Sequence, residues 1–174
     1  MSSNNSDGAV VTGAASGIGR AIAAALAADG FSVVVADLDE TNGRAAAEEI
    51  AASNQNRAIF QRVDVTDRAS VSAAIEACIR QFGSIKVIVN NAGFNKPEPF
   101  LEASVATWHK VMDVNALGVM IGIQEAAKAM IAAGTKGKII NTASIAGRTG
   151  YADFALERPF KKHKSSSFLT LTLS

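Results

Sequence analysis

The segment from Thr12 to Gly19 (TGAASGIG) joins a short apolar run to a helical pattern and contains three glycines. Glycines at such a junction let the backbone turn sharply and approach a ligand, while free N–H groups at the start of a helix attract a phosphate. A tight turn between a strand and a helix would also need glycines, so the segment alone is weak evidence. The residues of this candidate pyrophosphate site are Gly13, Ser16, Gly17, Ile18 and Gly19.

An acidic residue, Asp37, ends the second apolar run, 18 residues after Gly19. A carboxylate at this spacing can accept hydrogen bonds from the hydroxyls of an adenosine ribose. A helix-capping or solvated aspartate is the alternative, but the two features together are much less expected by chance than either alone. Because a carboxylate repels a 2′-phosphate and no basic residue adjoins Asp37, the sequence favours NAD over NADP.

Two further short motifs follow in order along the chain. Asp64 and Val65 end the third apolar run, and the motif N-N-A-G follows the fourth. With T-G-x3-G-x-G, these motifs make residues 9–156 resemble the classical short-chain dehydrogenase/reductase family. The resemblance implies that Asp64 and Val65 flank the adenine of the cofactor. The positions that it places under the two riboses are Asn91, Ala92 and Gly93.

The resemblance also implies a reaction, hydride transfer between the nicotinamide and a carbinol or carbonyl carbon. Four catalytic positions carry it in the family: an Asn, a Ser, a Tyr and a Lys. Asn115 (in VNALG) matches the asparagine that holds a proton-relaying water, and Ser144 (in NTAS) matches the serine that holds the substrate oxygen. A locally bonded helix asparagine and a plain turn serine are the alternatives.

The tyrosine position of the family, 13 residues after Ser144, holds Glu157. A carboxylate with an ordinary pKa of about 4.3 has no proton to give at neutral pH. Tyr151, the single tyrosine, lies seven residues after Ser144 and is not expected to replace the missing phenol. Lys161 falls at the lysine position of the family, but the segment is rich in lysine and Pro159 disfavours a helix there. We interpret the match of Lys161 as coincidence.

Short apolar segments alternate with amphipathic segments over the chain. The pattern predicts strands at residues 9–12, 32–36, 58–63, 85–89 and 138–142. It predicts helices at residues 17–29, 41–53, 67–82 and 104–133, with Thr41 and Asp67 as N-caps of the second and third. This alternation is typical of a doubly wound α/β fold of the Rossmann type, in which a parallel sheet lies between two layers of helices.

The family-like pattern ends at residue 156, which predicts one Rossmann domain over residues 1–156. Residues 157–174 hold a basic run, three serines and a short Leu/Thr alternation, for which loop or disorder is expected. The last strands of the family fold are therefore expected to be missing. Strand 138–142 would then be an exposed, aggregation-prone edge and the product poorly soluble. The tail is either genuine or the result of a reading-frame change.

Composition narrows the classes of function and partner. Hydrophobic residues make up 48% of the chain and charged residues 19%, with a net charge of +1, which favours a soluble globular protein. No nucleic acid or membrane surface is expected as a partner, and no metal site is expected. The lone Cys78 and the absence of an apolar N-terminal segment favour a reducing, cytoplasmic location.

Two functions remain open from the sequence, and position 157 separates them. The first is an NAD-dependent oxidoreductase acting on a small secondary alcohol or ketone, and residues 118–146 look most like the branch that acts on polyols and acetoin or diacetyl. The second is an inactive remnant that at most binds dinucleotide or a partner subunit, and Glu157 favours it. Helix 104–133 is apolar nearly all round, so either a partner subunit, as in the family's dimers and tetramers, or a missing helix would cover it.

Overall fold

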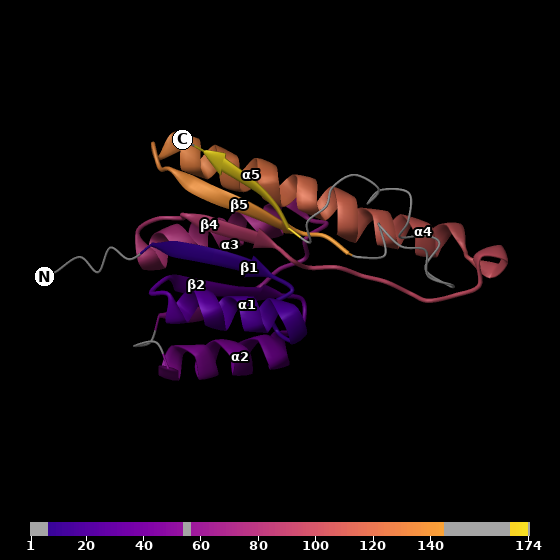
Figure 1. Ribbon diagram of the computed structural model, residues 1–174, viewed down its shortest axis with the longest axis horizontal. Coiled ribbons are helices and arrows are strands. Elements are labelled where there is room, and N and C mark those ends of the chain that lie inside the picture. Colours follow the sequence, from indigo (N-terminus) through magenta and orange to yellow (C-terminus); the bar gives the residue numbers. More distant parts are fainter. Residues whose placement is uncertain (1–6, 54–56, 145–167, 174) are drawn as a thin grey trace, which may run out of the picture.

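A six-stranded sheet with the order β3-β2-β1-β4-β5-β6 forms the centre of the computed structural model, which describes residues 7–53, 57–144 and 168–173 (Figure 1). The first five strands run parallel to one another. The strands are β1 (Gly8–Thr12), β2 (Ser32–Asp37), β3 (Ala58–Arg62), β4 (Val87–Asn90), β5 (Gly137–Thr142) and β6 (Phe168–Leu173).

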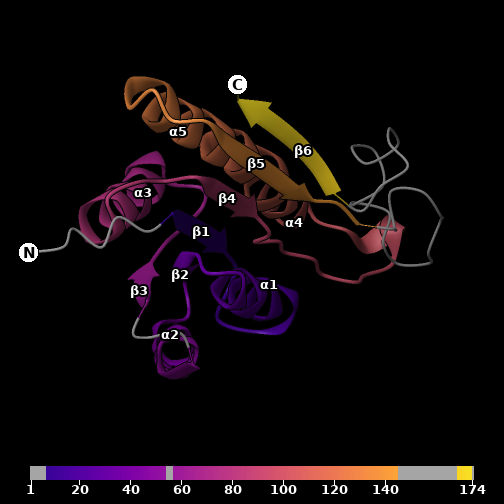
Figure 2. The ribbon, with the colours of Figure 1, turned by 60° about the vertical axis from the view of Figure 1, so that its left-hand side comes forward.

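Helices cover both faces of this sheet, and Figure 2 shows α1 and α2 on one side with α3 and α5 on the other. The prediction of a doubly wound, three-layer α/β fold is confirmed. The helices are α1 (Gly17–Ala28), α2 (Glu40–Ser53), α3 (Arg68–Phe82), α4 (Val105–Met112) and α5 (Gly118–Ala132), with a 3-10 turn η1 (Phe100–Glu102) and a π-helical turn η2 (Asp113–Leu117). None of the helices in the described part of the chain has the length and apolar character needed to span a bilayer.

The core lies in two layers because successive residues of a strand point to opposite faces of the sheet. Val10 and Ile88 pack in the cluster that contains residues of α3 and α5. Val11 and Val89, their neighbours in sequence, pack in the cluster that contains residues of α1 and α2. Strands buried on both faces must be apolar at every position, which explains why continuous apolar runs predicted them.

The caps of two helices test the sequence prediction at single residues. Asp67 caps α3 as predicted, because its side chain accepts a hydrogen bond from the Ala69 N–H at 3.0 Å. The prediction of Thr41 as the cap of α2 is wrong. The Asn42 N–H donates to Oδ1 of Asp39 at 3.0 Å, so the cap lies two residues earlier, at Asp39, and the helix begins at Glu40.

The prediction of one continuous helix over residues 104–133 is also wrong. The π-helical turn Asp113–Leu117 separates α4 from α5. Turns of this kind insert a residue into an α-helix and often lie at functional sites. The side chain of Asn115, in the middle of this turn, bonds to the backbone of Phe94, 21 residues earlier, as described with the site below.

Residues 168–173 correct the expectation of disorder after residue 156. They form β6, which pairs antiparallel with β5 in a register that runs from Gly137 opposite Leu173 to Thr142 opposite Phe168. The Leu/Thr alternation has the two-residue period of a strand, and the open edge of β5 supplies the hydrogen-bonding groups that such a strand needs. Strand β5 is therefore not the edge of the sheet. Residues 157–167 lie outside the described part, and low solubility stays a prediction.

Glu125 on α5 joins the two helices that cover one face of the sheet. Its carboxylate accepts from Lys128 Nζ at 2.8 Å, from Arg68 on α3 and from Ser72 Oγ at 3.1 Å. The hydrogen bonds from Lys128 and Arg68 lower the pKa of Glu125 to about 2. A carboxylate that is this strongly held is ionised in the folded protein at every ordinary pH.

We expect Glu125→Gln to lower the free energy of unfolding by on the order of 1–3 kcal/mol at pH 7. A carboxyl whose pKa is lower in the folded protein stabilises the fold fully above its unfolded pKa of about 4.5, and this stabilisation is lost as the pH falls from about 5 toward 2. Urea unfolding at a series of pH values would show the gap to wild type closing in that range. Glu76→Gln, at an exposed position of α3, is the control, and a gap that stays constant with pH would contradict the assignment.

Candidate functional site

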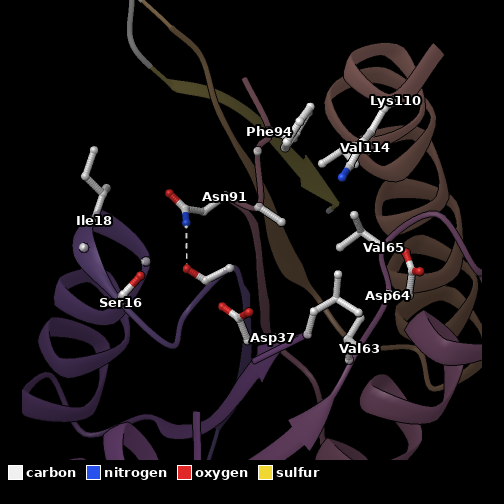
Figure 3. A pocket seen from close by; sticks show the side chains of 16 residues that line it. Ser16, Ile18, Asp37, Val63, Asp64, Val65, Asn91, Phe94, Lys110 and Val114 are labelled. Atoms are coloured by element: carbon white, nitrogen blue, oxygen red, sulfur yellow. Dashed lines mark hydrogen bonds between the residues drawn. The ribbon is translucent and has the colours of Figure 1, made fainter. Parts of the chain in front are cut away.

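A cleft of about 560 Å³ opens at the carboxyl ends of the parallel strands, between α1 and the α4 side of the sheet (Figure 3). All eleven residues that the sequence predicted for cofactor binding line this cleft. They are Gly13, Ser16, Gly17, Ile18, Gly19, Asp37, Asp64, Val65, Asn91, Ala92 and Gly93. The fold therefore brings together four segments that are far apart in the sequence, although their binding role stays a prediction.

The glycine-rich turn leaves room for a ligand at one position and none at another. Gly13 and Gly17 have φ values of 66° and 54°, in the left-handed region that favours glycine. A Cβ at Gly19 would lie 2.0 Å from the Gly13 carbonyl oxygen, so α1 packs directly on the turn. A Cβ at Gly17 would meet nothing within 4 Å, so the surface above it is open to a bound group.

The N-terminus of α1 faces this open surface without a side-chain cap. Ser16 occupies the cap position, but its hydroxyl makes no hydrogen bond to the first turn. The backbone N–H groups of the first turn therefore keep their hydrogen-bonding capacity for a ligand, and the helix dipole favours an anionic one. Ile18 is 66% exposed beside them and forms an apolar lip of the cleft.

The Asp37 carboxylate holds the glycine-rich turn in place and can still accept further hydrogen bonds. Its Oδ2 accepts from the Ala15 N–H at 2.9 Å, and its Oδ1 accepts from the Asp39 N–H at 3.0 Å. A carboxylate can accept about four hydrogen bonds, so each oxygen can take a further donor from the cleft. The side chain thus lies at the end of β2 in a fixed orientation, and the helix-capping alternative for Asp37 is not what the structure shows.

Asp64 lies across the cleft from Asp37 at the end of the third strand segment. Its Oδ1 accepts from the Thr66 N–H at 2.9 Å and from the Thr66 hydroxyl at 2.7 Å. These two bonds lower the pKa of Asp64 below its ordinary value, the side-chain bond more than the backbone bond. The adjacent Val63 and Val65 add apolar surface to the same wall.

Thr12 locks the glycine-rich turn to the N-N-A-G loop, a role that the sequence analysis missed. Its hydroxyl oxygen accepts from the N–H groups of Asn91 at 3.0 Å and Ala92 at 3.1 Å, and it donates to the Val89 carbonyl at 3.3 Å. The Asn91 side chain returns the contact by donating to the Thr12 carbonyl at 3.1 Å and the Gly13 carbonyl at 3.3 Å. The two loops therefore form one rigid floor of the cleft. Thr12 is the first residue of the T-G motif, so the motif could have identified it from the sequence.

Asn115 lies in the π-helical turn and bonds across the fold, not within its own helix. Its Oδ1 accepts from the Phe94 N–H at 2.8 Å, and its Nδ2 donates to the Phe94 carbonyl at 2.8 Å. The locally bonded alternative for Asn115 is thus wrong. The two bonds fix the chain directly after the N-N-A-G loop. The side chain lies next to that loop but is not part of the cleft wall, and its catalytic role stays a prediction.

Ser144 lies two residues beyond the end of β5, at the same edge of the sheet as the cleft, and is half-buried. It does not line the cleft itself. Tyr151, Glu157 and Lys161 lie outside the described residues, so the structure neither supports nor contradicts the interpretation of those positions. The predicted catalytic role of Ser144 likewise stays a prediction.

Five further residues line the cleft and were missed from the sequence. Four of them adjoin predicted residues along the chain, so each motif could have been extended by one position. The fifth lies one helical turn before Val114, a spacing that puts two side chains on one face of a helix. The five are Leu38, Val63, Phe94, Lys110 and Val114.

A model of the short chain dehydrogenase family matches residues 7–156. The chain belongs to the short-chain dehydrogenase family. The match covers the whole parallel part of the sheet and ends one residue before position 157. The resemblance inferred from the T-G-x3-G-x-G and N-N-A-G motifs is thereby confirmed.

Curated relatives of this chain include enzymes named for diols, polyols and diketones. An L-2,3-butanediol dehydrogenase of Corynebacterium glutamicum is 43% identical over 82% of this chain and 56% of its own length. A sorbitol dehydrogenase of Cereibacter sphaeroides is 40% identical over 83% of this chain and 55% of its own length. A diacetyl reductase of Staphylococcus epidermidis that forms (S)-acetoin is 36% identical over 82% and 55%. The chain thus spans little more than half the length of these relatives.

A solved structure supports the same assignment. The short chain dehydrogenase/reductase of Burkholderia phymatum in complex with NAD superimposes with a TM-score of 0.84 at 33% sequence identity. The match covers 93% of this chain and 57% of that one. The order of the five parallel strands and the helices on both faces are therefore those of the family.

Proposed function

We propose that this chain binds NAD in the cleft at the carboxyl ends of its strands. The observation that carries the proposal is the joint presence of the uncapped N-terminus of α1 and the Asp37 carboxylate in one cleft. The open surface above Gly17 fits a pyrophosphate, because a Cβ there would meet nothing within 4 Å. The residues present therefore fit the dinucleotide. The NAD complex of the Burkholderia phymatum relative supports the choice of ligand.

Each segment of the cleft would hold one part of the cofactor. The N–H groups of the first turn of α1 would donate to the pyrophosphate, and Asp37 would accept from the hydroxyls of the adenosine ribose. Asp64 and Val65 would flank the adenine, while the floor that Thr12 locks would support the riboses. When bound, NAD supplies a nicotinamide ring that accepts or releases a hydride. The chain's own contribution is to bind and orient that ring.

We infer that the lineage of this chain oxidises small secondary alcohols or reduces the corresponding ketones. The inference rests on relatives named for 2,3-butanediol, sorbitol and diacetyl. Ser144 would hold the substrate oxygen, and Asn115 would fix the loop after the N-N-A-G motif through Phe94. Polyols, diols and acetoin-like ketones are the substrate class that the inference selects.

A second function, dinucleotide binding without turnover, is favoured by Glu157. Proton transfer by a positioned acid or base contributes roughly 10²–10⁴-fold to the rate of such a reaction, and a glutamate of ordinary pKa is ionised at neutral pH. Formation of NADH from NAD and 2,3-butanediol by the full chain separates the two functions. NAD binding without turnover would support the second, and turnover would support the first.

We expect the wild-type chain to bind NAD more tightly than NADP, and Asp37→Asn to raise the Kd for NAD by roughly tenfold. The amide keeps the shape of the side chain but removes the charge that strengthens bonds from the ribose hydroxyls and that repels a 2′-phosphate. Isothermal titration with both cofactors would therefore show the preference for NAD shrinking. Asp29→Asn, at the opposite end of α1, is the control. A wild-type chain that binds neither cofactor would overturn the proposal.

A further inference from the structure

One wall of the cleft carries a lysine for which the sequence predicts no role. Lys110, on α4, lines the cleft beside Phe94, and Figure 3 shows its ammonium directed toward Val65. Among the cleft-lining residues that the structure describes, Lys110 is the one cation, whereas Asp37 and Asp64 are carboxylates. A lysine in this place meets a ligand in the cleft as well as solvent.

An aromatic ring on a fixed stretch of backbone contacts the lysine in this position. The Nζ of Lys110 lies 4.3 Å from the centroid of the Phe94 ring, which is a cation–π contact. Phe94 in turn is bonded through both its N–H and its carbonyl to the Asn115 amide, each at 2.8 Å. These two bonds fix the backbone from which the ring projects, and the contact with the ring limits the freedom of the lysine, so less side-chain entropy is lost when a ligand meets the ammonium.

The ammonium is not committed to a neighbouring carboxylate. Within the described ranges, no ion pair joins Lys110 to an aspartate or glutamate. Asp64, the nearest acidic residue to Val65 in sequence, accepts its hydrogen bonds from Thr66. A lysine offers three donors and no acceptor, so its donors can serve a ligand that presents acceptors.

The surroundings of the ammonium suit a purine base better than a phosphate. Val65 and Val114 give this wall an apolar surface, and the helix N-terminus that attracts phosphate lies on the α1 side of the cleft. The ring nitrogens of adenine are acceptors on an electron-rich ring, which an ammonium attracts. We propose that Lys110, held by Phe94, is a binding residue for the adenine of the dinucleotide. The proposal rests on the proposed NAD site and adds a residue to it.

The test compares ligands that contain adenine with one that does not. Lys110→Met removes the charge, keeps the length of the side chain and retains a good helix former. Titration of the full chain should show the Kd for ADP-ribose and for AMP rising by about three- to tenfold, with that for nicotinamide mononucleotide unchanged. Lys110→Arg should restore most of the affinity. Lys136→Met, in the exposed turn before β5, is the control for loss of one positive charge.

Three other results of these titrations would each overturn the assignment of Lys110 as an adenine-binding residue. Equal binding of ADP-ribose by wild type and Lys110→Met would overturn the role of Lys110 while leaving the proposed NAD site intact. Equal weakening of ADP-ribose and nicotinamide mononucleotide would show that the ammonium acts on phosphate, not on adenine. A wild-type chain that does not bind ADP-ribose would overturn both the proposed function and this inference.

Discussion

Replacing Gly19 with alanine is expected to abolish measurable NAD binding and to lower the free energy of unfolding by about 1–3 kcal/mol. The added Cβ would lie 2.0 Å from the Gly13 carbonyl oxygen and 2.5 Å from Nδ2 of Asn91. The first of these atoms is backbone, so it cannot rotate away. The second belongs to the side chain that bonds the carbonyls of Thr12 and Gly13. One methyl group would therefore disturb both loops that form the floor of the cleft.

Thermal unfolding and NAD titration of Gly19→Ala measure the two effects separately. Ala24→Ser, at an exposed position of the same helix, controls for changes in helix propensity and should behave like wild type. Should Gly19→Ala unfold and bind NAD as wild type does, the close packing of α1 on the turn would not be what forms the site.

Removal of β6, by ending the chain at residue 167, is expected to cost several kcal/mol and to make the protein aggregate more than the full chain does. Strand β6 pairs with β5 over six residues, and each ladder hydrogen bond contributes about 0.5–1.5 kcal/mol net. Domains of this size have a total stability of about 5–15 kcal/mol, so the loss is a large fraction of it. The apolar strand β5 would then become an open edge on which another chain could pair.

Size-exclusion chromatography and circular dichroism melting of the shortened chain give the readout. Thr172→Lys is the matched control, because Thr172 is exposed and a lysine on an edge strand discourages further pairing without removing the strand. The control should elute at the same volume as the wild-type chain and melt at an unchanged temperature. A shortened chain that shows no more aggregate than the full chain and melts at the wild-type temperature would show that β6 does not stabilise the sheet.

The parallel sheet, its flanking helices and eleven of the sixteen residues that line the cleft could be predicted from the sequence alone. Strands buried on both faces must be apolar throughout, and a helix that covers a sheet must be amphipathic. Both elements therefore show a pattern of apolar residues that can be recognised in a short stretch of sequence. The glycine-rich turn and Asp37 are local as well, because each follows directly from the strand that it ends. Motifs at the ends of neighbouring parallel strands then meet at one edge.

Features that depend on contacts between distant segments could not be predicted from the sequence. The π-helical turn in the expected long helix accompanies the bonds of Asn115 to Phe94, 21 residues away, and no local pattern encodes that pairing. Lys110 likewise lies in the cleft beside Phe94, which is 16 residues earlier in the chain. Strand β6 required the open edge of β5, because a short Leu/Thr alternation has too little apolar surface to form a strand alone. Local sequence fixes what a segment can form, whereas its partners in space decide what it does form.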